Sequence, residues 1–300
     1  MNSIRILLDS AIDYAGLFPP AGLKMNAAVT NYAEGRVGRS SWALGRFVIP
    51  VSRLEEFESS AADLLPRSSA EMPWRLSVLG ESDRESDIEK IVFFNHRHLA
   101  NLDSGAAIID AIELKVRSVQ EIHQAMDNMS RHVETYLEIP LTEDAPALIA
   151  TIAQAGGRAK LRTGGLTPEL FPSPAELARF IYLCAQAGVP FKVTAGLHHP
   201  FSSIHRLSYD PMSPEAMMHG FLNVLVAAAF VRAGMSAGMA EEVLEEESCQ
   251  ALRFEDSGVS WRTQRLTNNQ LADTRKHFAL SFGSCSLQEP MDDLLALGLL

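Results

Sequence analysis

Cysteine is scarce in this sequence of 300 residues. Its three cysteines, Cys184, Cys249 and Cys285, lie far apart and form no C-x-x-C pair. Disulfide frameworks use an even number of cysteines, and structural zinc sites ordinarily contain cysteine pairs at short spacing. We therefore expect neither feature. This usage is typical of a reducing compartment, so the expected location is the cytoplasm.

Long hydrophobic runs are also missing. The longest apolar stretch, Gly220–Val231, is interrupted by Asn223. It is shorter than the roughly 20 residues that a helix needs to cross a bilayer. The first residues show no pattern of a secretory leader, because the apolar run after Arg5 is short and ends at Asp9. We expect no membrane partner, and we expect Gly220–Val231 to form a buried helix or a subunit-contact helix.

Positive charge is in deficit, with 26 Lys and Arg residues against 37 Asp and Glu residues and a net charge of −11. A protein that binds nucleic acid needs a basic surface to neutralise phosphates, and no such stripe is present. Nucleic acid is therefore not an expected partner. The hydrophobic fraction of 47 % and the charged fraction of 21 % are typical of a folded globular chain and exclude general disorder.

The sequence does contain a rhythm of short aliphatic runs, each followed by a longer amphipathic segment. Ser173-Pro174 is typical of a helix start, and Gly188 of a helix end. This alternation predicts an α/β protein whose parallel strands close into a (β/α)8 TIM-type barrel. The eight strand candidates are Phe47–Val51, Arg75–Gly80, Ala111–Val116, Val133–Pro140, Ala159–Thr163, Phe191–Ala195, Ala251–Glu255 and Phe278–Gly283.

The spacing of these candidates predicts two parts. Residues 1–45 form an N-terminal extension that caps the barrel, and residues 46–300 form a single barrel domain with an insertion after the sixth strand. The extension contains the Gly- and Pro-rich segment Asp13–Met25. Two interpretations of this segment remain open: it plugs one end of the barrel, or it contributes Asp13, Tyr14 or Lys24 to a substrate site.

Charged residues occur in several strands, although parallel strands that are buried on both faces are ordinarily apolar. Because side chains alternate along a strand, Glu113 shares a face with Lys115, and Lys160 shares a face with Arg162. Such clusters occur where an enzyme needs acids, bases or amines with a shifted pKa. A structural layer of salt bridges, or strands in another register, would be the alternative. The residues expected at the barrel mouth are Glu113, Lys115, Glu138, Lys160, Arg162 and Lys192.

Glycine-rich segments follow three of the strands: RTGG at Arg162–Gly165, TAG at Thr194–Gly196 and FGSCS at Phe282–Ser286. Backbone N–H groups that are exposed at such turns suit an anion. We therefore predict a small, anionic substrate. The residues expected to bind it are Glu113, Arg162, Thr163, Gly164, Thr194, Gly196, Gly283 and Ser284.

The stretch from Lys160 to Gly196 resembles the paired late strands of the deoxyribose-phosphate aldolase family of class I aldolases. That family has a Lys-x-x-Thr-Gly strand end, then a Phe-Lys-x-small-Gly strand, and a Phe-Gly-Ala-Ser-Ser type phosphate site; KLRTG, FKVTAG and FGSCS are similar. The resemblance implies that Lys160 forms a Schiff base, that Lys192 is the cation that lowers its pKa, and that Gly283 and Ser284 bind phosphate. Three departures are the insertion, Arg162 in place of a small residue, and the lysines counted on the fifth and sixth strands instead of the sixth and seventh.

The expected function is therefore a lyase of aldolase type that needs no cofactor. It would act on a small carbonyl compound, phosphorylated or not, through Lys160, Lys192 and Glu138, within a homo-oligomer. One alternative is a hydrolase or lyase that holds a divalent metal through His198, His199 and Glu138, because histidines and a carboxylate at strand ends suit such an ion. Another is a barrel without catalysis, whose apolar helix at Gly220–Val231 mediates assembly.

Overall fold

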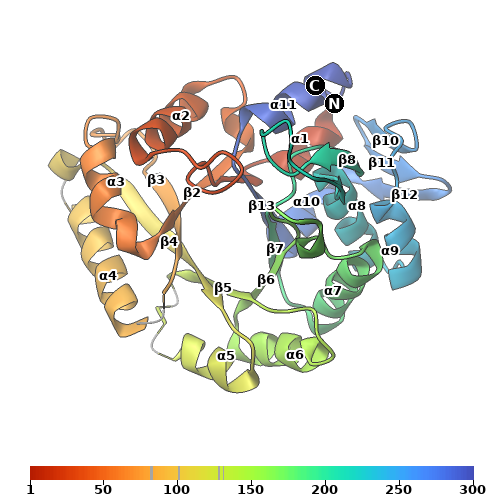
Figure 1. Ribbon diagram of the computed structural model, residues 1–300, viewed down its shortest axis with the longest axis horizontal. Helices are drawn as coiled ribbons and strands as arrows, with labels where there is room; N and C mark the ends of the chain where they lie inside the picture. Colours follow the sequence, from red (N-terminus) through yellow and green to blue (C-terminus); the bar gives the residue numbers. More distant parts are fainter. Residues whose placement is uncertain (82–83, 101, 128, 131) are drawn as a thin grey trace.

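Parallel strands close into an eight-stranded barrel in the computed structural model, which describes residues 1–81, 84–100, 102–127, 129–130 and 132–300 (Figure 1). The order around the barrel is β1-β2-β3-β4-β5-β6-β7-β13, and β13 pairs with β1. The predicted (β/α)8 TIM-type barrel is thus confirmed. The barrel strands are β1 (Ile12–Tyr14), β2 (Leu44–Pro50), β3 (Trp74–Leu79), β4 (Ala107–Lys115), β5 (Glu134–Glu138), β6 (Arg158–Arg162), β7 (Phe191–Thr194) and β13 (Ala279–Ser284).

Helices surround the barrel and connect its strands (Figure 1). α7 begins with a capping box, in which the Ser173 hydroxyl accepts a hydrogen bond from the Glu176 N–H group. It ends at Gly188, whose φ of 66° is in the left-handed region that favours glycine. The helices are α1 (Asn2–Leu8), α2 (Met25–Val37), α3 (Leu54–Ala61), α4 (Arg84–Ala100), α5 (Val119–Met126), α6 (Ala145–Ala155), α7 (Pro174–Ala187), α8 (Phe221–Arg232), α9 (Ala237–Leu244), α10 (Asn268–His277) and α11 (Gln288–Ala296).

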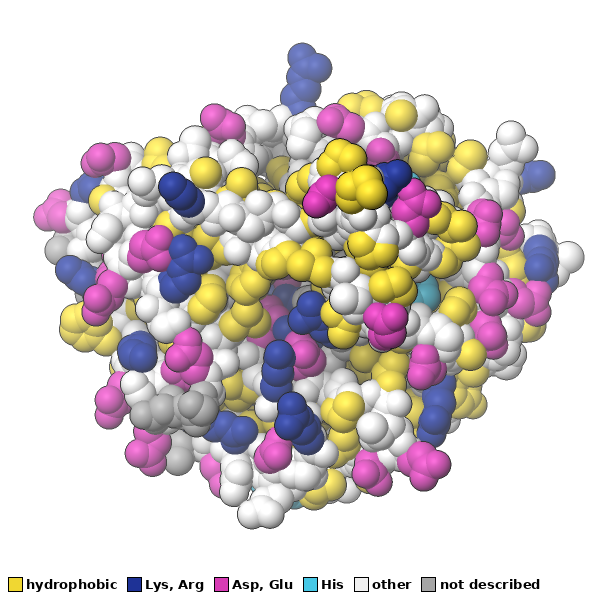
Figure 2. Space-filling model, viewed as in Figure 1, with side chains coloured by type: hydrophobic (Ala, Val, Ile, Leu, Met, Phe, Trp, Pro, Cys, Tyr) yellow, Lys and Arg dark blue, Asp and Glu magenta, His cyan; other side chains and the backbone are white. Residues whose placement is uncertain are grey.

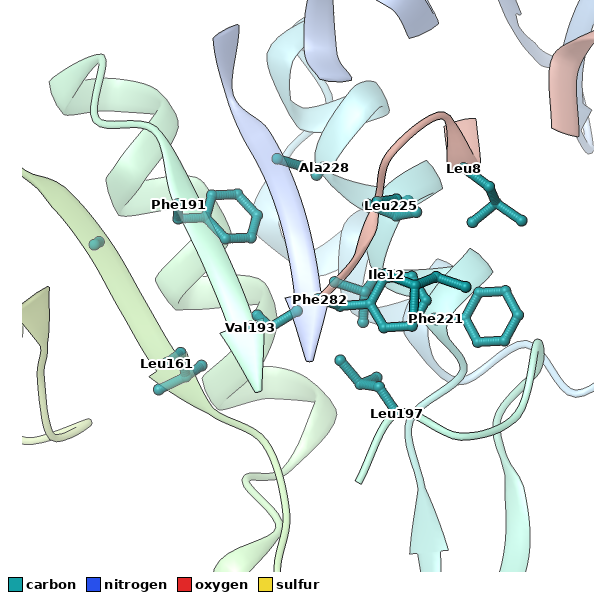
Figure 3. Close-up of a cluster of buried hydrophobic side chains, with 14 of the residues drawn as sticks. Leu8, Ile12, Leu161, Phe191, Val193, Leu197, Phe221, Leu225, Ala228 and Phe282 are labelled. Atoms are coloured by element: carbon teal, nitrogen blue, oxygen red, sulfur yellow. The ribbon is translucent and has the colours of Figure 1, made fainter. Parts of the chain in front are cut away.

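The hydrophobic core lies between the barrel strands and these helices. Figure 3 shows Phe191, Val193 and Phe282 on the side of their strands that α8 covers. The ring of Phe221 in α8 stacks on that of Phe282, with centroids 5.0 Å apart. Because side chains alternate along a strand, residues such as Lys192, between Phe191 and Val193, point into the barrel.

The predicted division into a capping extension at 1–45 and a barrel at 46–300 is wrong, because β1 lies within the first 45 residues. β1 has only three residues and is centred on Asp13, so it carries no hydrophobic periodicity that would reveal a strand. The candidate Ala251–Glu255 is also outside the barrel. It contains β10 (Leu252–Glu255), which forms a separate antiparallel sheet with β11 (Gly258–Trp261) and β12 (Gln264–Thr267).

The insertion consequently follows the seventh barrel strand instead of the sixth. It contains the hairpin of β8 (Ser203–Arg206) and β9 (Glu215–Met218), then α8, α9 and the three-stranded sheet. All residues from Phe221 to Val231 in α8 are buried within this one chain. Of the two expectations for this apolar stretch, the buried helix is confirmed, and the helix has no apolar face left for subunit contact.

Candidate active site

The barrel register brings the predicted charged residues together at the carboxyl ends of the strands. Lys160 of β6 is the register partner of both Glu138 of β5 and Lys192 of β7. Glu113 enters from β4, and Asp13 from β1. Of the N-terminal residues considered, Asp13 joins the site. Tyr14 instead packs against other aromatic rings, and Lys24 lies exposed at the start of α2.

These five side chains form a continuous chain of alternating charge. Glu113 is shared: its Oε2 lies 2.7 Å from Lys160 Nζ, and its Oε1 lies 2.7 Å from Lys192 Nζ. Lys160 Nζ also lies 2.7 Å from Glu138 Oε2, and Lys192 Nζ lies 2.5 Å from Asp13 Oδ2. We call the series Glu138–Lys160–Glu113–Lys192–Asp13 the charge chain. Pairing of this kind is what allows charges to be buried inside a barrel.

Further donors satisfy the two deepest carboxylates. The Ser77 hydroxyl donates to Glu113 Oε1 at 2.7 Å, and the Ser281 hydroxyl donates to Asp13 Oδ2 at 2.7 Å. The backbone N–H of Arg46 donates to Asp13 Oδ1 at 2.9 Å. Buried polar groups require such partners. Ser77 and Ser281 could not be selected as site residues from the sequence, because a serine in a strand carries no signal of its burial.

Burial and pairing act against each other on the pKa values. Burial, the largest influence, lowers the pKa of Lys160, but the charges of Glu113 and Glu138 outweigh it and raise that pKa above its ordinary value. Asp13 and Glu113 do the same for Lys192. In return, the lysines hold the pKa of Glu113 below its usual range. The net pKa of Lys160 is therefore raised in the resting site, whereas the resemblance implies a lowered one.

A second ionic network crosses the opposite, amino-terminal end of the barrel. The Arg46 guanidinium lies 2.6 Å from Asp110 and 2.9 Å from Glu134, and Glu134 also contacts Arg158 at 3.1 Å. Charges at this end of a TIM-type barrel stabilise the fold, whereas active sites lie at the carboxyl end. A structural salt-bridge layer therefore exists as well, but it is distinct from the charge chain.

A cavity of about 1150 Å³ opens over the charge chain. Figure 2 shows the hollow at the centre of this face, with Lys, Arg, Asp and Glu side chains gathered in it. Lys160, Glu113 and Glu138 line the cavity. The Lys192 side chain is 0 % exposed and is sealed from it. The two lysines of the charge chain thus differ in their access to a ligand.

The upper walls of the cavity are mostly apolar and come from three loops. Phe18, Pro19 and Pro20 follow β1; Leu166, Leu170 and Phe171 follow β6; Leu207, Tyr209 and Met218 belong to the insertion. An apolar wall above a charged floor suits a small organic molecule.

The predicted substrate-binding residues divide into two groups. Glu113, Arg162, Thr194, Gly196 and Gly283 line the cavity, as does Lys115. The remaining three, Thr163, Gly164 and Ser284, make contacts within and between the loops instead. The Thr163 hydroxyl donates to the Ala195 carbonyl at 2.8 Å, and Ser284 Oγ accepts a hydrogen bond from the Ser286 N–H at 3.3 Å. Gly164 packs backbone to backbone with Gly196, since a Cβ added to Gly164 would lie 2.7 Å from Gly196 Cα.

The histidines predicted as metal ligands have other partners than Glu138, which binds Lys160. His198 Nδ1 lies 3.1 Å from Glu289 Oε2 and 3.8 Å from Cys285 Sγ. Burial lowers the pKa of His198, but its hydrogen bonds with Cys285 and Glu289 raise that pKa to about 9. His199 instead pairs with Asp293 at 2.6 Å. The expected set of His198, His199 and Glu138 is therefore wrong, and the sequence interpretation missed Cys285 and Glu289.

Barrel enzymes place their active sites at the carboxyl ends of the strands, where the charge chain and the cavity lie. Comparison with protein-family models, with curated proteins and with solved structures finds no significant match to this chain. The function is therefore inferred from the geometry of the barrel and its charged interior.

Proposed function

We propose that this protein is a lyase of class I aldolase type that acts on a small carbonyl compound through a Schiff base on Lys160. The observation that carries the proposal is that only one of the two adjacent lysines is accessible from the cavity. Lys160 lines the cavity, and its Nζ lies 2.7 Å from each of two carboxylates that can take up its proton. Lys192 is sealed from the cavity and can act only through Glu113.

The positions of the two lysines in the barrel also support the proposal. Because β1 is the first strand, Lys160 stands on the sixth strand and Lys192 on the seventh. These are the strands on which the deoxyribose-phosphate aldolase family carries its lysine pair, so one of the three departures from the family pattern disappears. Arg162 and the insertion after β7 remain as differences.

The reaction begins with proton transfer, because Lys160 is charged at rest. Its Nζ gives a proton to Glu138 Oε2, and the free amine attacks the substrate's carbonyl carbon, so that a C–N bond forms. Glu138 returns this proton to the carbonyl oxygen and then transfers a second proton from the nitrogen to the same oxygen, which leaves as water, so that a protonated imine remains. Lys192 competes for Glu113, which limits how strongly that carboxylate holds the proton on Lys160.

Cleavage follows at the carbon–carbon bond beyond the imine. The electron pair of that bond moves toward the nitrogen and forms an enamine, while Glu138 takes the proton of the substrate hydroxyl and an aldehyde leaves. Protonation of the enamine carbon by Glu138, then hydrolysis of the imine, releases the second product and restores the lysine. Arg162 and Lys115 line the same cavity, which favours a substrate with an anionic group.

Borohydride trapping tests the proposal. The protein is incubated with a panel of small aldehydes, ketones and 2-oxo acids, with and without phosphate groups, and is then reduced with sodium borohydride. Mass spectrometry of peptides should find a stable secondary amine on Lys160. Lys160→Met should lose this adduct, and Lys276→Met, which changes an exposed lysine of α10 away from the cavity, should keep it.

Two outcomes would overturn the proposal. One is an adduct whose yield is undiminished in Lys160→Met. The other is the absence of any adduct on Lys160 across the whole panel, which would leave Lys160 as a cation that holds an anionic substrate.

A further inference from the structure

One cluster of reactive side chains at the cavity has no part in the proposed Schiff-base chemistry. His198 lies in the loop after β7, Cys285 directly follows β13, and Glu289 is in the first turn of α11. All three line the cavity that Lys160 also lines. We call these residues the His–Cys–Glu cluster.

The cluster does not have the geometry of a cysteine nucleophile with its base. Such a relay uses both ring nitrogens of histidine, one toward the nucleophile and one toward the acid. Here a single nitrogen, His198 Nδ1, faces both Glu289 Oε2 at 3.1 Å and Cys285 Sγ at 3.8 Å. The three side chains therefore converge on a common point.

Convergence of this kind is what a metal ion requires. The nitrogen, sulfur and oxygen ligand atoms all lie within 4.8 Å of one another. Zinc bonds of about 2.0 Å to nitrogen and oxygen and about 2.3 Å to sulfur place tetrahedral ligand atoms roughly 3.3–3.5 Å apart. The observed separations of 3.1 Å and 3.8 Å need only a small adjustment to reach this geometry.

We propose that His198, Cys285 and Glu289 bind a Zn²⁺ ion whose fourth coordination position opens to the cavity. One imidazole, one thiolate and one carboxylate form a ligand set that suits zinc, and together they neutralise its charge. Three protein ligands with one open position are typical of zinc that meets a substrate, whereas structural sites are closed. The Ser286 hydroxyl accepts a hydrogen bond from the Glu289 N–H at 3.1 Å, which fixes the start of α11.

The proposed zinc site goes beyond the lyase proposal, because Schiff-base chemistry needs no metal. Its open position shares the cavity with Lys160, so an oxygen of a carboxylate, phosphate or hydroxyl group on the substrate can become the fourth ligand. The zinc site would then hold one end of the substrate, and Lys160 would react with its carbonyl group.

Metal titration of the substrate-free protein tests this site. After treatment with a chelator, calorimetry with ZnCl₂ should show one equivalent bound, and Co²⁺ should give the charge-transfer absorption of a thiolate ligand. Cys285→Ser should lose that absorption, and His198→Ala should weaken Zn²⁺ binding more than roughly tenfold. Cys249→Ser, at a partly buried cysteine outside the cluster, is the matched control and should bind as the unchanged protein does.

Binding that is equal in His198→Ala and Cys249→Ser, thiolate absorption that survives in Cys285→Ser, or no binding at one equivalent would each overturn the zinc site. If His198→Ala does not fold, Glu289→Gln removes a different ligand and takes its place. Lys160→Met should bind Zn²⁺ normally, so failure of the Schiff-base proposal and failure of the zinc site are distinguishable.

Discussion

At the scale of single residues, the charge chain holds three carboxylates against two ammonium groups. The surplus of negative charge is what keeps the pKa of Lys160 raised despite burial. Glu138 and Glu113 therefore have opposite effects on reactivity: they stabilise the ammonium form, and they are also the groups that can receive its proton. Reactivity of Lys160 depends on this balance.

Glu138→Gln should shift the reactivity of Lys160 to lower pH. The substitution removes one of the two charges that raise the pKa of Lys160, so the free amine becomes available at a lower pH. The measurement is the pH dependence of Lys160 alkylation by a small aldehyde and cyanoborohydride, followed by mass spectrometry. Glu143→Gln, at an exposed position after β5, should leave the profile unchanged. A shift of the Glu138→Gln profile to higher pH would contradict the electrostatic account.

Much of the charge chain could be predicted from the sequence, because charged residues in otherwise apolar strands are conspicuous. Glu113, Glu138, Lys160 and Lys192 were found in this way. Cys285 and Glu289 could not be recognised as partners of His198, because neither lies at a metal-ligand spacing from it in the sequence. They meet His198 only when β7 and β13 become neighbours.

At the scale of elements, the loops that follow β6 and β7 meet at their glycines. A Cβ at Gly164 would lie 2.7 Å from Gly196 Cα and 2.8 Å from the Phe171 ring. The contact holds together the ends of the two strands that carry Lys160 and Lys192. These glycines were predicted as anion-binding residues, but Gly164 has a steric reason to be glycine.

Gly164→Ala should separate these two strand ends. Overpacking of this kind lowers the free energy of unfolding by about 1–3 kcal/mol, and the displaced β6 end should also reduce borohydride trapping on Lys160. Urea denaturation and the trapping assay measure the two effects. Gly238→Ala is the control, because nothing lies within 4 Å of a Cβ at that position in α9. Equal stability and trapping in both variants would show that the Gly164–Gly196 contact is unimportant.

Two strands were misassigned from the sequence: one candidate lies outside the barrel, and one barrel strand was not predicted. In Leu252–Glu255 buried and exposed residues alternate, a pattern that is typical of an antiparallel strand with one solvent-exposed face. Its apolar residues alone do not distinguish it from a barrel strand. The error for β1 is the opposite one, a barrel strand that was not predicted, because a strand of three residues with a central aspartate has no hydrophobic periodicity.

At the scale of the whole molecule, the barrel is closed by its first strand. β1 pairs with β13 on one side and with β2 on the other, so residues 1–45 are part of the barrel wall. Asp13 on this strand also supplies the last carboxylate of the charge chain. Loss of the segment would expose the edges of β2 and β13 and leave Lys192 with one partner fewer.

A variant that lacks residues 1–45 should therefore not fold into a stable barrel. The expected observations are loss of a cooperative thermal transition in circular dichroism and aggregation in size-exclusion chromatography, whereas the full chain should be monodisperse. A shortened chain that unfolds cooperatively and elutes as a single species would restore the division into an extension and an independent barrel.

Closure between β1 and β13 has a consequence for the order of events on the ribosome. Asp13 and Ser281, which are bonded in the finished barrel, are separated by 268 positions. At about 5–20 residues per second, synthesis leaves the early strand without its neighbour for roughly 15–50 s. During that interval Asp13 lacks the hydroxyl group of Ser281, and β1 has a free edge on the side where β13 will pair with it. Nascent chains of this protein should thus be substrates for chaperones until the last barrel strand emerges.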